Sequence, residues 1–162
     1  MKMNHLATVC TFLAILFAIP AFSLDPASVK TSLLAYLDGK LPEEKFHIEY
    51  NDIRASRVGE VITLDGSGYY YRKLVESDGK ATESRNNISR LEVEKVVNIL
   101  LEIEASVQKK PAASPVPAET RATLKIRIGS DTTEIWERYT ELLQNHRVGR
   151  IKDAMRVIGE RK

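Results

Sequence analysis

The chain has almost no cysteine and lacks the histidine spacing of metal sites. Its single cysteine, Cys10, lies in an apolar run near the start, so the rest of the chain has no thiol for a disulfide or a nucleophile. The two histidines beyond that run, His47 and His146, have no second histidine or cysteine at zinc-ligand spacing. We therefore expect a cysteine-free mature chain held by packing alone, with no metal and no cofactor.

A strong excess of charge is also absent. The 162 residues carry a formal net charge of only +2, whereas nucleic-acid-binding domains usually carry a large basic excess. No nucleic-acid partner is expected. From Arg147 to the end the chain is locally basic, which allows contact with an anionic membrane, but an amphipathic helix packed on its own domain is the favoured interpretation.

The first 23 residues have the pattern of an export signal. Lys2 supplies a positive charge, Leu6 to Ile19 is an uncharged apolar core, and small residues end at Ser23. This pattern predicts removal of residues 1–23 and a periplasmic or secreted location. The alternative is a retained membrane anchor, because Met3 to Leu24 has no formal charge and is about long enough to span a bilayer.

Residues 24–162 are expected to form a single domain, since 139 residues suffice to bury a core. Three prolines interrupt the pattern at 110–117, and proline neither continues a helix nor enters the centre of a sheet. Because neither side has enough apolar segments for a core of its own, this stretch is interpreted as an internal loop.

Hydrophobic periodicity and turn residues predict the order α-β-β-β-α-β-β-α. The expected segments are a helix from Pro26 toward Gly39, strands at Phe46–Asn51, Glu60–Leu64 and Tyr69–Glu76, a helix after Ser89, strands at Ala122–Ile128 and Glu134–Thr140, and a helix over Val148–Ile158. The fold class is therefore α+β, with a mainly antiparallel sheet of about five strands packed against helices. The polar run Lys80–Asn87 is either a loop or a weak edge strand.

Two short motifs fix element ends. Asp65-Gly66-Ser67-Gly68 is rich in residues that accept positive φ and predicts a hairpin turn. Ser89 followed by Glu92 predicts a capping box, with the serine side chain bonded to the backbone N–H of Glu92. Gly66-Ser67-Gly68 lacks the spacing of a serine-hydrolase nucleophile turn.

The run Val61 to Gly68, the helix after Ser89 and the final strand pair together resemble a group of small exported bacterial domains of unknown function. Those domains have a similar "l-T-I-d-G-d-G" hairpin ahead of a helix and a last strand pair. The resemblance covers Phe46 to Ile158 and implies an exported α+β domain. It brings no catalytic residues. The run Tyr69–Tyr71 and the proline-rich stretch depart from that pattern.

Two groups of side chains are candidates for ligand binding. Tyr69 and Tyr71 share one side of a strand, and with Arg72 nearby they offer a stacking and cationic surface, although core packing is the plainer interpretation. Arg127 and Arg138 belong to a row of outward cations on the last two strands. Glu134 and Glu137 are expected to neutralise that row by cross-strand pairing.

The preferred function is an exported, non-enzymatic binding or interaction module whose partner is a protein, a glycan or an envelope component. One alternative is a small acid/base hydrolytic enzyme in which His47 or His146 meets a carboxylate such as Asp52 or Asp65. Another is an envelope-associated structural protein held by an uncleaved signal or by the basic carboxyl-terminal helix. In a eukaryotic source, Asn87-Ile88-Ser89 would be a glycosylation sequon.

Overall fold

The computed structural model describes residues 26–54, 57–109, 121–142 and 146–161. The predicted signal at 1–23 and the proline-rich stretch at 110–117 lie outside these residues. No helix within the described ranges is long and apolar enough to cross a membrane.

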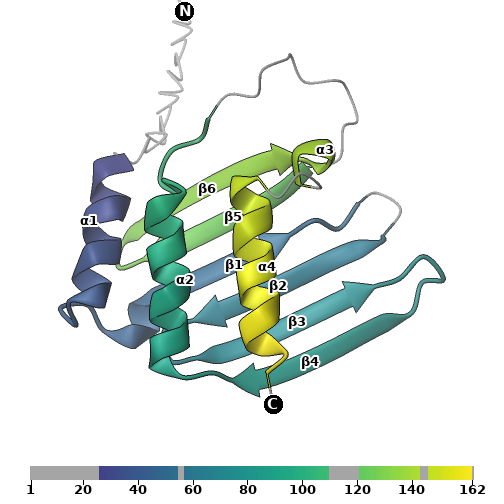
Figure 1. Ribbon diagram of the computed structural model, residues 1–162, viewed down its shortest axis with the longest axis horizontal. Coiled ribbons are helices and arrows are strands. Elements are labelled where there is room, and N and C mark those ends of the chain that lie inside the picture. The colour runs from purple at the N-terminus through teal and green to yellow at the C-terminus, as the bar shows by residue number, and fades with distance from the viewer. Residues whose placement is uncertain (1–25, 55–56, 110–120, 143–145, 162) are drawn as a thin grey trace, which may run out of the picture.

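Six antiparallel strands form one sheet in the order β4-β3-β2-β1-β5-β6 (Figure 1). The strands are β1 (Phe46–Asn51), β2 (Gly59–Asp65), β3 (Tyr69–Val75), β4 (Ala81–Asn87), β5 (Arg121–Ile128) and β6 (Asp131–Arg138). The first four follow one another as a meander, and β5 then pairs with the free side of β1. Elements before and after the proline-rich stretch are therefore joined in the same sheet.

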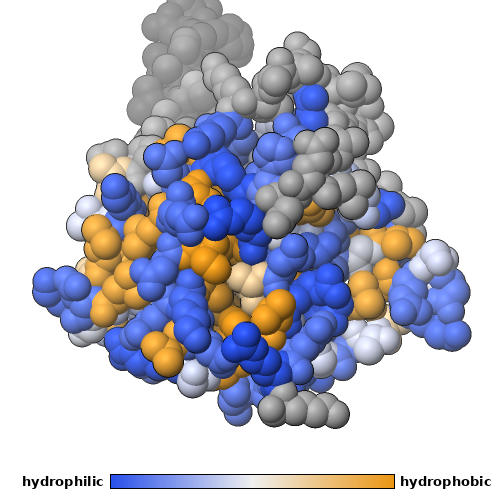
Figure 2. Space-filling view, viewed as in Figure 1, coloured by the Kyte–Doolittle hydropathy of each residue, from blue (hydrophilic) through white to orange (hydrophobic). Residues whose placement is uncertain are grey.

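Three helices cross one face of this sheet side by side (Figure 1). They are α1 (Pro26–Leu37), α2 (Arg90–Glu102) and α4 (Arg147–Gly159); the short segments η1 (Glu43–Lys45) and α3 (Tyr139–Leu142) complete the described elements. The left-handed residue expected at the end of α1 is present, because Gly39 has a φ of 70°. The surface on the helical side is mostly hydrophilic, with hydrophobic patches between the helices (Figure 2).

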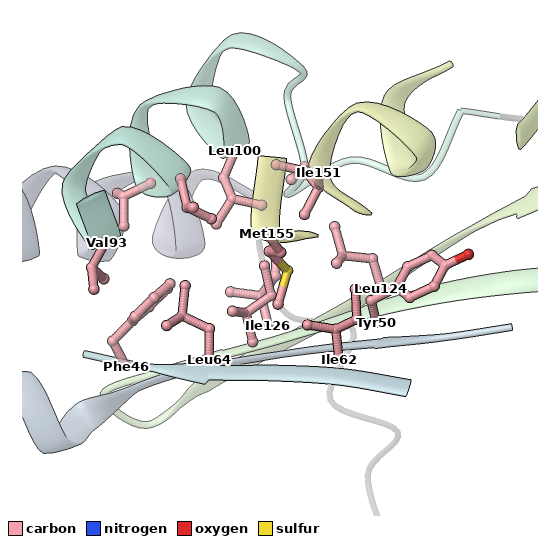
Figure 3. Close-up of a cluster of buried hydrophobic side chains, with 14 of the residues drawn as sticks. Phe46, Tyr50, Ile62, Leu64, Val93, Leu100, Leu124, Ile126, Ile151 and Met155 are labelled. Carbon is pink, nitrogen blue, oxygen red and sulfur yellow. The ribbon is translucent and has the colours of Figure 1, made fainter. Parts of the chain in front are cut away.

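The core lies between the sheet and the three helices. Alternate strand residues point to it, so Phe46, Ile48 and Tyr50 of β1 are fully buried, and the same alternation recurs on β2 and β5. The predicted stripe of α2 is also confirmed, since Leu100 is 0% exposed and points toward the strands (Figure 3). From α4, Ile151 and Met155 enter the same cluster.

The predicted antiparallel α+β class is confirmed, with one strand more than expected. Residues 81–87 form β4, whose side chains are nearly all exposed. An edge strand that contributes no side chain to the core has no hydrophobic alternation. The sequence pattern therefore did not distinguish a strand from a loop here. The helix α2 does begin after Ser89, but the predicted side-chain cap is absent; Glu92 N–H donates to the backbone oxygen of Ser89, and the Glu92 carboxylate pairs with Arg161.

The turn at Asp65 to Gly68 forms as expected and also fixes the start of α2. The carboxylate of Asp65 accepts hydrogen bonds from the backbone N–H of Ser67 and of Tyr69, each at 3.0 Å. Gly68 has a φ of 90°, and a Cβ added there would lie 2.1 Å from the carbonyl oxygen of Ile88. Only glycine allows this close approach of the hairpin to the segment that leads into α2.

Candidate functional site

The face of the sheet opposite the helices is the first candidate surface. Each strand sends every second side chain to it, and strand register places these side chains in rows. The row through the middle of the sheet runs in the order Arg85, Tyr71, Thr63, Glu49, Lys125 and Glu134. We call this side of the sheet the open face, because the three long helices all lie on the other side.

Aromatic rings on the open face are partnered by arginine. The guanidinium carbon of Arg85 lies 5.0 Å from the ring centroid of Tyr71, and that of Arg121 lies 4.1 Å from the ring centroid of Trp136. Such pairs are favourable, and they hold the rings in fixed positions on the surface. Tyr69 adds a third ring that is 43% exposed. Arg85 was missed in the sequence because it lies on the unassigned strand β4.

The structure places four of the five predicted ligand-binding residues on the open face. Tyr69 and Tyr71 lie on β3, Arg127 on β5 and Arg138 on β6. Because β3 and β5 are three strand spacings apart, or about 14 Å, these residues form two separate groups on the face and not one compact site. Arg72 lies on the other face, toward the helices.

The two glutamates expected to neutralise the cationic row lie on opposite faces of the sheet. Glu134 lies beside Lys125 on the open face. Glu137 instead points to the core, where it is 8% exposed and accepts a hydrogen bond of 2.9 Å from the backbone N–H of Val148 at the start of α4. Burial raises the pKa of Glu137, although the backbone N–H groups oppose the shift.

The two histidines of the enzyme hypothesis lie on different elements. His47 lies on the open face directly across from Asp65, but the Asp65 carboxylate already accepts the bonds of its own turn. Burial and then the charge of Arg127 lower the pKa of His47. Asp52 lies on the helical side, opposite to His47. His146 immediately precedes α4.

A buried network of ion pairs connects α4 to the sheet and includes Arg72. The Glu60 carboxylate is 3% exposed and accepts a hydrogen bond from Nε of Arg72. Nη1 of Arg72 donates to Glu160 at 2.7 Å, and Nζ of Lys152 lies 3.5 Å from Glu60 Oε2 and 3.2 Å from Asp52 Oδ2. The network thus joins β2, β3 and the residue after β1 to α4 and to Glu160 at its end.

Further hydrogen bonds satisfy the carboxylate of Asp52 in this network. Asp52 accepts the hydroxyl of Tyr50 at 2.7 Å and also the backbone N–H of Glu60. Burial raises the pKa of Tyr50, and the adjacent Asp52 raises it further, so this hydroxyl stays protonated and donates. Burial works to lower the pKa of Arg72, but the hydrogen bond and charge of Glu60 outweigh it and raise that pKa. We infer that Arg72 serves to position α4.

Comparison with known proteins adds no assignment to either surface. Neither a protein-family model nor a curated protein matches this chain. Within the described ranges, no three histidine, cysteine, aspartate or glutamate side chains come together as metal ligands.

Proposed function

We propose that the chain is a non-enzymatic binding module that contacts a protein partner through the open face. The observation that carries this proposal is the position of all three long helices on one side of a six-stranded sheet, so that no helix of the described residues covers the other side (Figure 1). On that side lie the rings of Tyr71 and Trp136, each of which is stacked against an arginine.

The composition and size of the open face support a protein partner. Tyrosine, tryptophan and arginine are the residues that contribute most to protein interfaces. Six strands about 4.8 Å apart and about 20 Å long present roughly 500 Å², which approaches the share of each partner in a standard interface. The alternation of charge along the middle row, from Glu49 to Lys125 to Glu134, favours a partner with complementary charges in register.

A photoreactive amino acid at Thr63 is expected to give a discrete crosslink to another protein in the native host. Thr63 is at the centre of the open face, with Tyr71 and Glu49 on either side. The adduct should weaken when Tyr71→Ala and Trp136→Ala are combined, because the loss of an aromatic anchor costs 2 kcal/mol or more, about thirtyfold in affinity. Immunoblotting and mass spectrometry measure the adduct.

Matched controls come from the helical side. A photoreactive residue at Asn98, which is exposed on α2, should give no such adduct. Combining Leu91→Ala with Val157→Ala removes two exposed apolar side chains from that side and should leave the Thr63 adduct unchanged. Equal adducts from Thr63 and Asn98 would contradict the proposal, as would an adduct whose mass is that of two copies of this chain.

Export to the periplasm or the medium is part of the proposal. It rests on the charge and apolar pattern of residues 1–23. N-terminal sequencing of the native protein is expected to begin at Leu24, because signal peptidase cleaves after small residues such as Ser23. A sequence that begins at Met1 would instead favour the membrane-anchor alternative.

A further inference from the structure

A cleft opens beside the buried network, on the helical side of the sheet. Its volume is about 580 Å³, within the range of small-molecule sites. It is lined by residues that follow β1 and β3, by the network, and by two helices: Asp52, Arg54, Val58, Gly59, Glu60, Leu74, Val75, Glu76, Ser77, Asp78, Tyr139 and Lys152. The β1–β2 and β3–β4 connections lie at the same end of the strands (Figure 1).

The charges on the floor of the cleft neutralise one another. Lys152 lies between the carboxylates of Asp52 and Glu60, and Glu60 is also bonded to Arg72. A ligand that competed for these groups would have to break buried ion pairs, which is costly. The groups available to a ligand are therefore those on the walls.

Arg54 is a cation on the wall without an anion. Its guanidinium carbon lies 4.0 Å from the centroid of the Tyr139 ring, so the ring holds one face of the guanidinium. Among the described residues no carboxylate lies within ion-pair distance of Arg54, and its Nε is buried without a hydrogen-bond partner. A guanidinium stacked on an aromatic ring keeps its edge available for the two oxygens of a carboxylate.

Glu76 supplies a negative group in the same row of the sheet. The backbone N–H of Arg54 bonds to the carbonyl oxygen of Val58, and the pairing of Gly59 with Val75 places Val58 opposite Glu76. The backbones of Arg54 and Glu76 are therefore two strand spacings apart, about 10 Å, with Val58 between them. In the part of the chain that the structure describes, Glu76 forms no ion pair.

We propose that this cleft binds a free α-amino acid with an apolar side chain, with the ligand carboxylate at Arg54 and the ligand ammonium at Glu76. The wall between these charges is apolar, formed by Val58 and Leu74. A zwitterion matches one available cation and one available anion. A phosphate or another dianion matches the cleft poorly, because Asp52, Glu60 and Glu76 would repel it.

Calorimetric titration with L-leucine tests the proposal on the mature chain. We expect saturable binding with one site. Two analogues separate the two charges: 4-methylpentanoate lacks the ammonium, and 3-methylbutylamine lacks the carboxylate. Each should bind at least tenfold more weakly than leucine, because the loss of a charge-assisted hydrogen bond costs about 1.5 to 3 kcal/mol. No heat of binding with leucine at millimolar concentrations would overturn the proposal.

Substitutions then place the ligand. Arg54→Gln should weaken leucine binding at least tenfold, and Glu76→Gln should remove the preference for leucine over 4-methylpentanoate. Arg57→Gln is the matched control, because Arg57 is exposed on the same connection but does not line the cleft. Unchanged binding in folded Arg54→Gln, checked by circular dichroism, would overturn the site. The open-face crosslink from Thr63 should persist in Arg54→Gln. The experiments therefore distinguish a failure of the cleft proposal from a failure of the open-face proposal.

Discussion

Replacing Glu60 by alanine is expected to lower the free energy of unfolding by about 3 to 5 kcal/mol. Glu60 is 3% exposed and joins Arg72 of β3 to Lys152 of α4. Its removal leaves two partly buried cations with one acceptor fewer, and an unpaired buried charge costs far more than the net contribution of an intact pair. Urea denaturation, followed by circular dichroism, measures the change.

The control for Glu60 is an exposed ion pair on the same sheet. Glu83→Ala breaks the pair of Glu83 with Arg85, at 2.8 Å on the surface of β4, and should cost no more than about 1 kcal/mol. The double variant Glu60→Leu with Arg72→Met removes both charges and should recover part of the loss, since an apolar pair of similar volume needs no partner. A Glu60→Ala midpoint equal to that of Glu83→Ala would show that the network adds nothing to stability.

Leu100→Ala is expected to cost about 2 to 5 kcal/mol because it empties a fully buried position. The side chain lies between α2 and the sheet, beside Leu33 of α1, and points into the cluster drawn in Figure 3. Thermal and urea unfolding measure the change. Leu91→Ala on the same helix is the control, since Leu91 is 63% exposed and should shift the midpoint little. An equal shift in both variants would mean that α2 contributes through helix propensity and not through packing.

The elements that sequence analysis predicted best are those in which one local signal determines the structure. The stripe of α2, from Val93 to Leu100, packs against the sheet because apolar side chains recur at helical spacing. The hairpin at Asp65 to Gly68 forms because its residues supply both the Asx bonds and the positive φ. In both cases the signal is carried by residues close together in the sequence.

What the sequence did not predict depends on long-range contacts. Arg72 lies on the helical side because Glu60 and Glu160, the latter 88 positions away, neutralise it there. The sequence of β3 places a charged residue on each face, so the pattern does not predict which face points to the core. Ser89 occupies the cap position without its side-chain bond, and Glu92 is drawn instead to Arg161, 69 positions further on. The cleft beside Arg54 was likewise not predicted, because its lining residues come from two hairpins and two helices that meet only in the folded chain.

The pairing of β1 with β5 has a consequence for the order of folding. Thr123 meets Asn51 across a separation of 72 positions, whereas β2, β3 and β4 each pair with the strand just before them. A chain delivered amino-terminus first, as during synthesis, can complete the meander while one edge of β1 still has no neighbour. That edge, Phe46 to Asn51, is then a template for pairing with another chain. The speed with which residues 121–128 arrive therefore sets how long the nascent protein is exposed to aggregation.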